Sequence, residues 1–215
     1  MTLTIAIQLD DYIILTGDQR LIVECESFTQ LPAKTIYDGY KKIKYWKHGA
    51  ITVSGDVLLM YYFHELLELY AQKSNFDLLQ IAQIAKKMYI NDRKPSNQAT
   101  GVAFLSIFSF GKVELITLSI EETEIEYETI APMNAHFSMF AGTPDDPIYQ
   151  NFVDALRCIG NFPSFKAFFE YHVDLIKAFY KRQKSFDESI TATFDLFIQN
   201  TQTGYGFMHT ITNLD

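Results

Sequence analysis

The stretch from Met1 to Arg20, MTLTIAIQLDDYIILTGDQR, decides the fold that this sequence predicts. Two apolar runs rich in β-branched residues flank Asp10–Asp11, which is the pattern of a β-hairpin with a tight turn. The second run ends in a glycine followed by Asp18. The outer ends of an antiparallel hairpin are neighbours, so we expect the hydroxyl of Thr2 to lie near the carboxylate of Asp18.

A threonine at the N-terminus carries its own base. The α-amino group has an unperturbed pKa of roughly 8 and can accept the hydroxyl proton near neutral pH. The short side chain of Thr2 favours removal of Met1 by the ordinary aminopeptidase. The other interpretation is a surface hairpin in which Thr2 only forms a strand and Asp18 only ends one, and the residue types alone leave both open.

Composition indicates a packed globular protein, because 48% of its 215 residues are hydrophobic and 15% are aromatic. We expect a single domain over residues 1–215. The net charge is −8 and no basic stripe alternates with aromatics, which argues against nucleic acid or an anionic membrane as partner. Cys25 and Cys158 lie far apart, and the histidines are scattered. We therefore expect no disulfide, metal or cofactor, and a cytoplasmic location without an export signal or membrane span.

Strands occur in antiparallel blocks and helices in pairs along the chain. This order predicts an α+β fold, a four-layer αββα sandwich of two antiparallel sheets flanked by helix pairs. Residues 21–40 are expected to form a long connection with at most one short strand. The other expected elements are a hairpin over 41–54, helices over 56–74 and 75–93, strands over 100–109, 113–120, 123–130 and 135–141, a helix from 145 or 146 to 159, a long helix capped by Ser164, and a closing hairpin over 189–212.

Five short motifs stand at the ends of the predicted elements. They are Thr2-Leu3-Thr4-Ile5, Gly17-Asp18-Gln19-Arg20, Lys42-Ile43, Ser54-Gly55-Asp56 and Ala141-Gly142-Thr143. These motifs resemble those of the proteasome β subunits and their bacterial relatives, including the peptidase subunit of the two-component ATP-dependent protease, which are N-terminal nucleophile (Ntn) hydrolases. The resemblance covers the order of elements over essentially the whole chain.

The resemblance implies a threonine-type peptidase or amidohydrolase. Thr2 would attack the carbonyl of a peptide or protein substrate, and Lys42, held by Asp18, would favour the alkoxide. The Gly55 N–H would face the oxyanion, a donor worth roughly 3 kcal/mol elsewhere. Thr143 and Ser189 would stand near the amine. The resemblance also implies a homo-oligomeric ring or helical stack, and leaves an ATP-dependent unfoldase open as a partner.

Three features depart from the family pattern. Lys34 keeps the gap-free spacing from Thr2 and competes with Lys42, although strand context favours Lys42. Asp187 stands one residue too close to Ser189, and the glycines that should follow Ser189 are missing. The alternative function is therefore a catalytically inactive proteasome-like subunit with a structural or binding role. Substrate preference would depend on residues 21–28 and on pocket residues that the sequence alone does not identify.

Overall fold

The computed structural model describes residues 3–25, 33–72, 77–92, 99–138 and 147–213. Within these residues two five-stranded antiparallel sheets form, together with a separate two-stranded one. Sheet I has the order β10-β1-β2-β11-β12, with β1 (Thr4–Gln8), β2 (Tyr12–Asp18), β10 (Asn134–Ser138), β11 (Phe194–Asn200) and β12 (Gly206–Ile211). Sheet II runs from β5 to β9 in sequence order, with β5 (Ile43–Trp46), β6 (Gly49–Gly55), β7 (Gly101–Ser109), β8 (Lys112–Ile120) and β9 (Ile125–Thr129).

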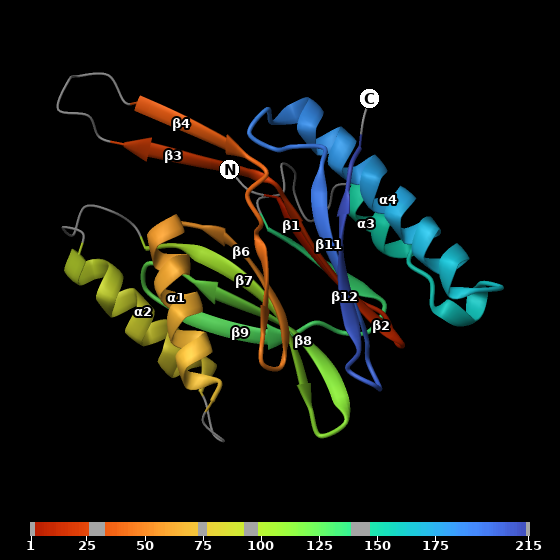
Figure 1. Ribbon diagram of the computed structural model, residues 1–215, viewed down its shortest axis with the longest axis horizontal. Coiled ribbons are helices and arrows are strands. Elements are labelled where there is room, and N and C mark those ends of the chain that lie inside the picture. The colour runs from red at the N-terminus through yellow and green to blue at the C-terminus, as the bar shows by residue number, and fades with distance from the viewer. Residues whose placement is uncertain (1–2, 26–32, 73–76, 93–98, 139–146, 214–215) are drawn as a thin grey trace.

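Helices cover the outer face of each sheet, which gives the predicted αββα sandwich (Figure 1). Sheet II packs against α1 (Val57–Tyr70) and α2 (Leu78–Asp92), and sheet I packs against α3 (Pro147–Asp154) and α4 (Phe165–Phe186). Strand β2 is apolar on both faces because each face packs into a different hydrophobic layer. Ile14 packs toward the helices, whereas Leu15 packs into the layer between the two sheets.

Side-chain caps set where the long helices begin. Asp56 accepts hydrogen bonds from the backbone N–H groups of Leu58 and Leu59 at the start of α1. Ser164 accepts one from the N–H of Ala167, and this confirms the predicted cap of α4. Helix α2 begins at Leu78 after an Asp77 cap, later than the predicted start at residue 75.

Three larger differences separate the predicted elements from the structure. The segment 21–40 holds two strands instead of at most one, because β3 (Arg20–Cys25) pairs with β4 (Ala33–Asp38) as a protruding ribbon (Figure 1). Residues 35–40 are exposed, so this ribbon lacks the apolar alternation that marks a core strand. The closing hairpin begins at Phe194 rather than residue 189.

The third difference is the helix expected to reach residue 159, which ends at Asp154. The residues after Asp154 form other hydrogen bonds instead of continuing the helix. The backbone N–H of Ile159 donates to Oδ2 of Asp11 at 2.7 Å, across the fold in the turn between β1 and β2. The Arg157 guanidinium donates to the carbonyl of Asp154 at 2.6 Å, which satisfies an acceptor at the helix end.

His172 on α4 makes stability depend on pH. Its side chain is 1% exposed, Nδ1 lies 2.9 Å from the carbonyl of Phe168, and burial lowers its pKa from the ordinary value near 6.5. The unfolded chain therefore binds this proton more readily, so stability should fall as pH drops below about 6.5. Each unit of pKa difference contributes about 1.4 kcal/mol.

We predict that His172→Leu reduces the loss of unfolding free energy between about pH 7.5 and about pH 5, measured by urea denaturation. His209→Leu, which removes an exposed histidine on β12, is the control and should keep the wild-type pH dependence. An unchanged slope for the His172 variant would contradict the prediction.

Candidate active site

The end of the first hairpin is tied to Asp18 by both backbone and side chain. The Asp18 N–H donates to the carbonyl of Leu3 at 3.0 Å, and the Leu3 N–H donates to Oδ1 of Asp18 at 2.8 Å. The buried Tyr180 hydroxyl from α4 adds a third bond by donating to the Leu3 carbonyl at 3.1 Å. Leu3 is therefore fixed from two sides, next to a carboxylate that has no exposed surface.

Lys42 links sheet II to Asp18 through an ion pair. Its Nζ lies 2.6 Å from Oδ1 of Asp18, and the lysine is only 4% exposed. Lys42 directly precedes β5 in sheet II, whereas Asp18 ends β2 in sheet I, so the ion pair joins the two sheets. A Cβ added to Gly17 would lie 3.2 Å from Cβ of Lys42, so the glycine makes room for this close approach.

The structure thus pairs Asp18 with Lys42, the lysine that strand context favours. The competing residue, Lys34, lies on β4, where its backbone pairs with Glu24 in the protruding ribbon. The Lys34 side chain lies outside the described part of the structure. Geometry therefore gives Lys42 the position beside the acid, and its catalytic role remains a hypothesis.

Burial acts on both members of the ion pair. It raises the pKa of Asp18, against the opposing effects of the Lys42 charge and hydrogen bond and of backbone N–H groups from Arg20 and Leu3. It also lowers the pKa of Lys42, although the Asp18 charge opposes this. Each charge favours the charged form of the other group, so the ion pair opposes the effect of burial on both pKa values.

Gly55 ends β6 just before α1 and lines the same cavity as Lys42. Its φ is +109°, and an added Cβ would lie 2.5 Å from Cα of Gly101 and from the carbonyl oxygen of Thr100. Only glycine fits this backbone. The preceding residue, Ser54, is hydrogen-bonded through its hydroxyl to that of Ser138 on β10, which gives a second polar link between the sheets.

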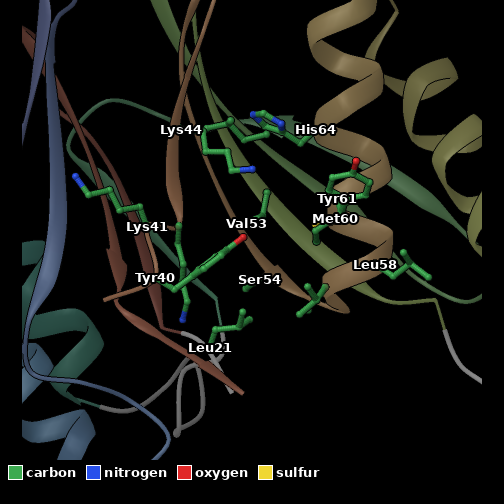
Figure 2. A pocket seen from close by; sticks show the side chains of 14 residues that line it. Leu21, Tyr40, Lys41, Lys44, Val53, Ser54, Leu58, Met60, Tyr61 and His64 are labelled. Carbon is green, nitrogen blue, oxygen red and sulfur yellow. The ribbon is translucent and has the colours of Figure 1, made fainter. Parts of the chain in front are cut away.

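A cavity of about 320 Å³ opens beside Lys42 and Gly55 (Figure 2). Its walls come from the start of β3, the segment before β5, strands β5 and β6, and the first turns of α1. The lining residues are Leu21, Tyr40, Lys41, Lys42, Lys44, Ile51, Val53, Ser54, Gly55, Val57, Leu58, Met60, Tyr61 and His64. A cavity beside an activated pair of charged groups is the usual arrangement of a substrate site.

The turn that carries Ser189 also contacts the two residues that follow Asp18. The Gln19 N–H donates to Oγ1 of Thr191 at 3.0 Å, and the Arg20 guanidinium donates to the carbonyl of Glu188 at 2.5 Å. The Ser189 hydroxyl oxygen is buried without a hydrogen-bond partner among the described residues. The two remaining predicted site residues, Thr2 and Thr143, lie outside the described residues. Sequence reasoning missed Thr191, whose only signal was its place two residues after Ser189.

Comparison with solved structures identifies the architecture. Anbu from Hyphomicrobium sp. strain MC1, as a Gly-1 mutant, matches with a TM-score of 0.69 and 11% identity, over 99% of this chain and 88% of that chain. The chain has the fold of Anbu. A helical assembly of the Anbu complex from Pseudomonas aeruginosa matches with a TM-score of 0.66 and 10% identity, over 99% of this chain and 88% of that one. Anbu from Yersinia bercovieri, described as an ancestral β-subunit, matches with a TM-score of 0.59 and 9% identity, over 96% and 86%.

At these identities the likeness to Anbu establishes the proteasome-like sandwich fold, and the chemistry has to be argued from this chain's own residues. No protein-family model matches the sequence, and no curated protein matches it. In the part of the chain that the structure describes, no helix is both long and apolar enough to cross a membrane. The same residues contain no group of three or more His, Cys, Asp or Glu side chains placed to hold a metal ion.

The ion pair makes a testable contribution to stability. We predict that Asp18→Asn lowers the free energy of unfolding by about 3–5 kcal/mol, because it leaves a buried ammonium group without its counter-charge. The double variant Asp18→Asn/Lys42→Met should recover a large part of this loss, since it removes both buried charges. Urea denaturation of the two single variants and the double variant measures the coupling free energy.

The exposed pair of Arg20 and Asp38 provides the matched control. Asp38→Asn removes an ion pair of 2.7 Å whose side chains are 24% and 56% exposed, so it should cost less than about 1 kcal/mol. Equal losses for the buried and the exposed pair would contradict the assignment of Asp18–Lys42 as a buried pair that links the sheets.

Proposed function

We propose that this chain is a threonine-type Ntn hydrolase that cleaves peptide or amide bonds after removal of Met1. The observation that carries the proposal is the buried ion pair of Asp18 and Lys42 beside the cavity, with the Leu3 N–H bonded to the same Asp18 oxygen as Lys42. Thr2 is covalently joined to Leu3. Its hydroxyl is thereby the nucleophile that the chain can bring to this lysine.

The proposed reaction has two steps. Thr2 Oγ attacks the carbonyl carbon of the substrate, its proton passes to the free α-amine directly or through a water molecule, and the C–N bond breaks as the leaving amine takes that proton. Water then attacks the Thr2 ester, takes the acyl group as a carboxylic acid and returns the proton to the threonine oxygen. The ammonium group of Lys42 lowers the cost of the alkoxide, and the Gly55 N–H faces the developing oxyanion.

The supporting residues have proposed roles around the amine. Asp18 holds Lys42 in place, while Thr143 and Ser189 help to orient the N-terminal amine. The contact of Thr191 with Gln19 supports this, because it places that turn next to the residue after Asp18. The Ser189 hydroxyl also has no hydrogen-bond partner among the described residues. No cofactor or metal is needed for this chemistry.

We also propose that the chain works as a homo-oligomer on peptide or protein substrates in the cytoplasm. The solved Anbu structure from Pseudomonas aeruginosa is a helical assembly, which supports a helical stack or ring for a chain of the same fold. An ATP-dependent unfoldase is the class of partner that would deliver folded proteins to such an assembly.

A catalytically inactive subunit with a structural or binding role is the second candidate function. Two observations favour it. The side chain of Asp187 accepts the N–H of Ser189 at 2.8 Å, within its own turn. The turn is also built without the glycines that would let backbone approach a nucleophile closely.

The state of the N-terminus distinguishes the two functions. We predict that the purified chain begins at Thr2 by intact mass, because a retained Met1 would block the amine. Hydrolysis of small fluorogenic peptides should fall roughly a thousandfold or more in Thr2→Ala. Thr2→Ser, which keeps a hydroxyl nucleophile, is the control and should retain measurable activity. Equal rates for the wild type and Thr2→Ala would refute the enzymatic proposal.

A further inference from the structure

The cavity beside Lys42 is basic, although the chain as a whole carries a net charge of −8. Three lysines and a histidine are among the described residues that line it, and none of those lining residues is acidic. The Lys42 amine is already engaged by Asp18. In Figure 2 the Lys41 amine points away from the cavity, whereas the Lys44 amine points into it, beside the ring of His64. Lys44 therefore supplies the positive charge that a ligand would meet.

His64 gives a second, independent indication of a ligand. Its side chain is buried, with 6% of the residue exposed, and neither ring nitrogen has a hydrogen-bond partner among the described residues. The Oε1 atom of Glu68 lies 3.5 Å from Nε2, which is too long for a good hydrogen bond. A buried polar group without a partner is unfavourable unless a ligand or water satisfies it. The charge of Lys44 also contributes to the lowered pKa of His64, after burial, so the two groups lie close together.

The spacing between the two lysines sets the size of the group that fits. Lys42 and Lys44 both line the cavity, whereas Ile43 between them packs into the layer between the sheets. They therefore share one face of the extended chain, and two residues of strand span about 6.6 Å. The cavity between them has apolar walls that include Val53 and Met60. Such walls suit the methylene groups of a side chain that runs from the reaction centre toward Lys44.

We propose that this cavity selects substrates with a carboxylate side chain, of glutamate length, on the acyl side of the cleaved bond. The inference rests on the proposed function for the place of the reaction, but the preference for an anion rests on Lys44 and His64. The Lys44 amine pairs with the carboxylate, an N–H of His64 donates a hydrogen bond to it, and the apolar walls contact the methylene groups.

Binding tests the preference without requiring catalysis. Two fluorescein-labelled tetrapeptide amides differ only in a final Glu or Gln, so that one side-chain carboxylate is the sole difference between the two probes. Fluorescence anisotropy on the full-length Thr2→Ala variant should give roughly tenfold tighter binding of the Glu peptide. Lys44→Met in the same background should abolish the difference, and Lys44 is exposed, so the variant should fold. Lys41→Met, which removes the neighbouring lysine whose amine points away, should keep it.

Three results would overturn the inference. These are equal binding of the two peptides, a Glu preference that survives Lys44→Met, and no binding of either peptide at millimolar concentration. Matched fluorogenic Glu and Gln substrates on the wild-type chain separate this inference from the proposed function. Selective binding without any hydrolysis supports the basic pocket and contradicts the hydrolase, whereas hydrolysis without a Glu preference supports the hydrolase and contradicts the pocket assignment.

Discussion

The buried ion pair between Asp18 and Lys42 is the interaction on which the rest of the site depends. Removing two charges from water is costly, and the cost is offset only where geometry and further hydrogen bonds are good. Here Asp18 accepts N–H groups from Leu3 and Arg20 in addition to the lysine. The pair therefore fixes the first hairpin, the start of sheet II and the chain that leads to Thr2 relative to one another.

The sandwich provides the setting for that pair. Strands β1 and β2 are buried on both faces, so an ionic link between the sheets forms here only where small or polar residues interrupt the apolar layer. Gly17 makes room for the aliphatic part of Lys42, and the hydrogen bond of Ser54 with Ser138 adds a second polar link. The same region opens into the cavity, because α1 starts immediately after the strained backbone of Gly55. Packing thus places a pocket next to the charged pair.

Sequence reasoning worked where the pattern is local. The hairpin, the Ser164 cap and the two stacked sheets follow from apolar periodicity and capping chemistry, and the strand context of Lys42 selected the lysine that pairs with Asp18. It failed where tertiary contacts, rather than local patterns, determine which elements form and where they end. In the ribbon of β3 and β4, residues 35–40 are all exposed and therefore give no apolar alternation, and helix α3 ends early where Ile159 bonds to Asp11 instead. The basic cavity was also missed, because Lys44 and His64 are far apart in sequence and meet only in the fold.

We propose that Thr2 is a nucleophile activated beside Asp18 and Lys42, and covalent labelling can locate that nucleophile. The purified chain is treated with a peptide that carries a threonine-directed electrophile, and the modified residue is located by mass spectrometry of proteolytic fragments. We expect one adduct per chain, on a fragment that begins at Thr2. An unlabelled chain, or an adduct on any other residue, would contradict it.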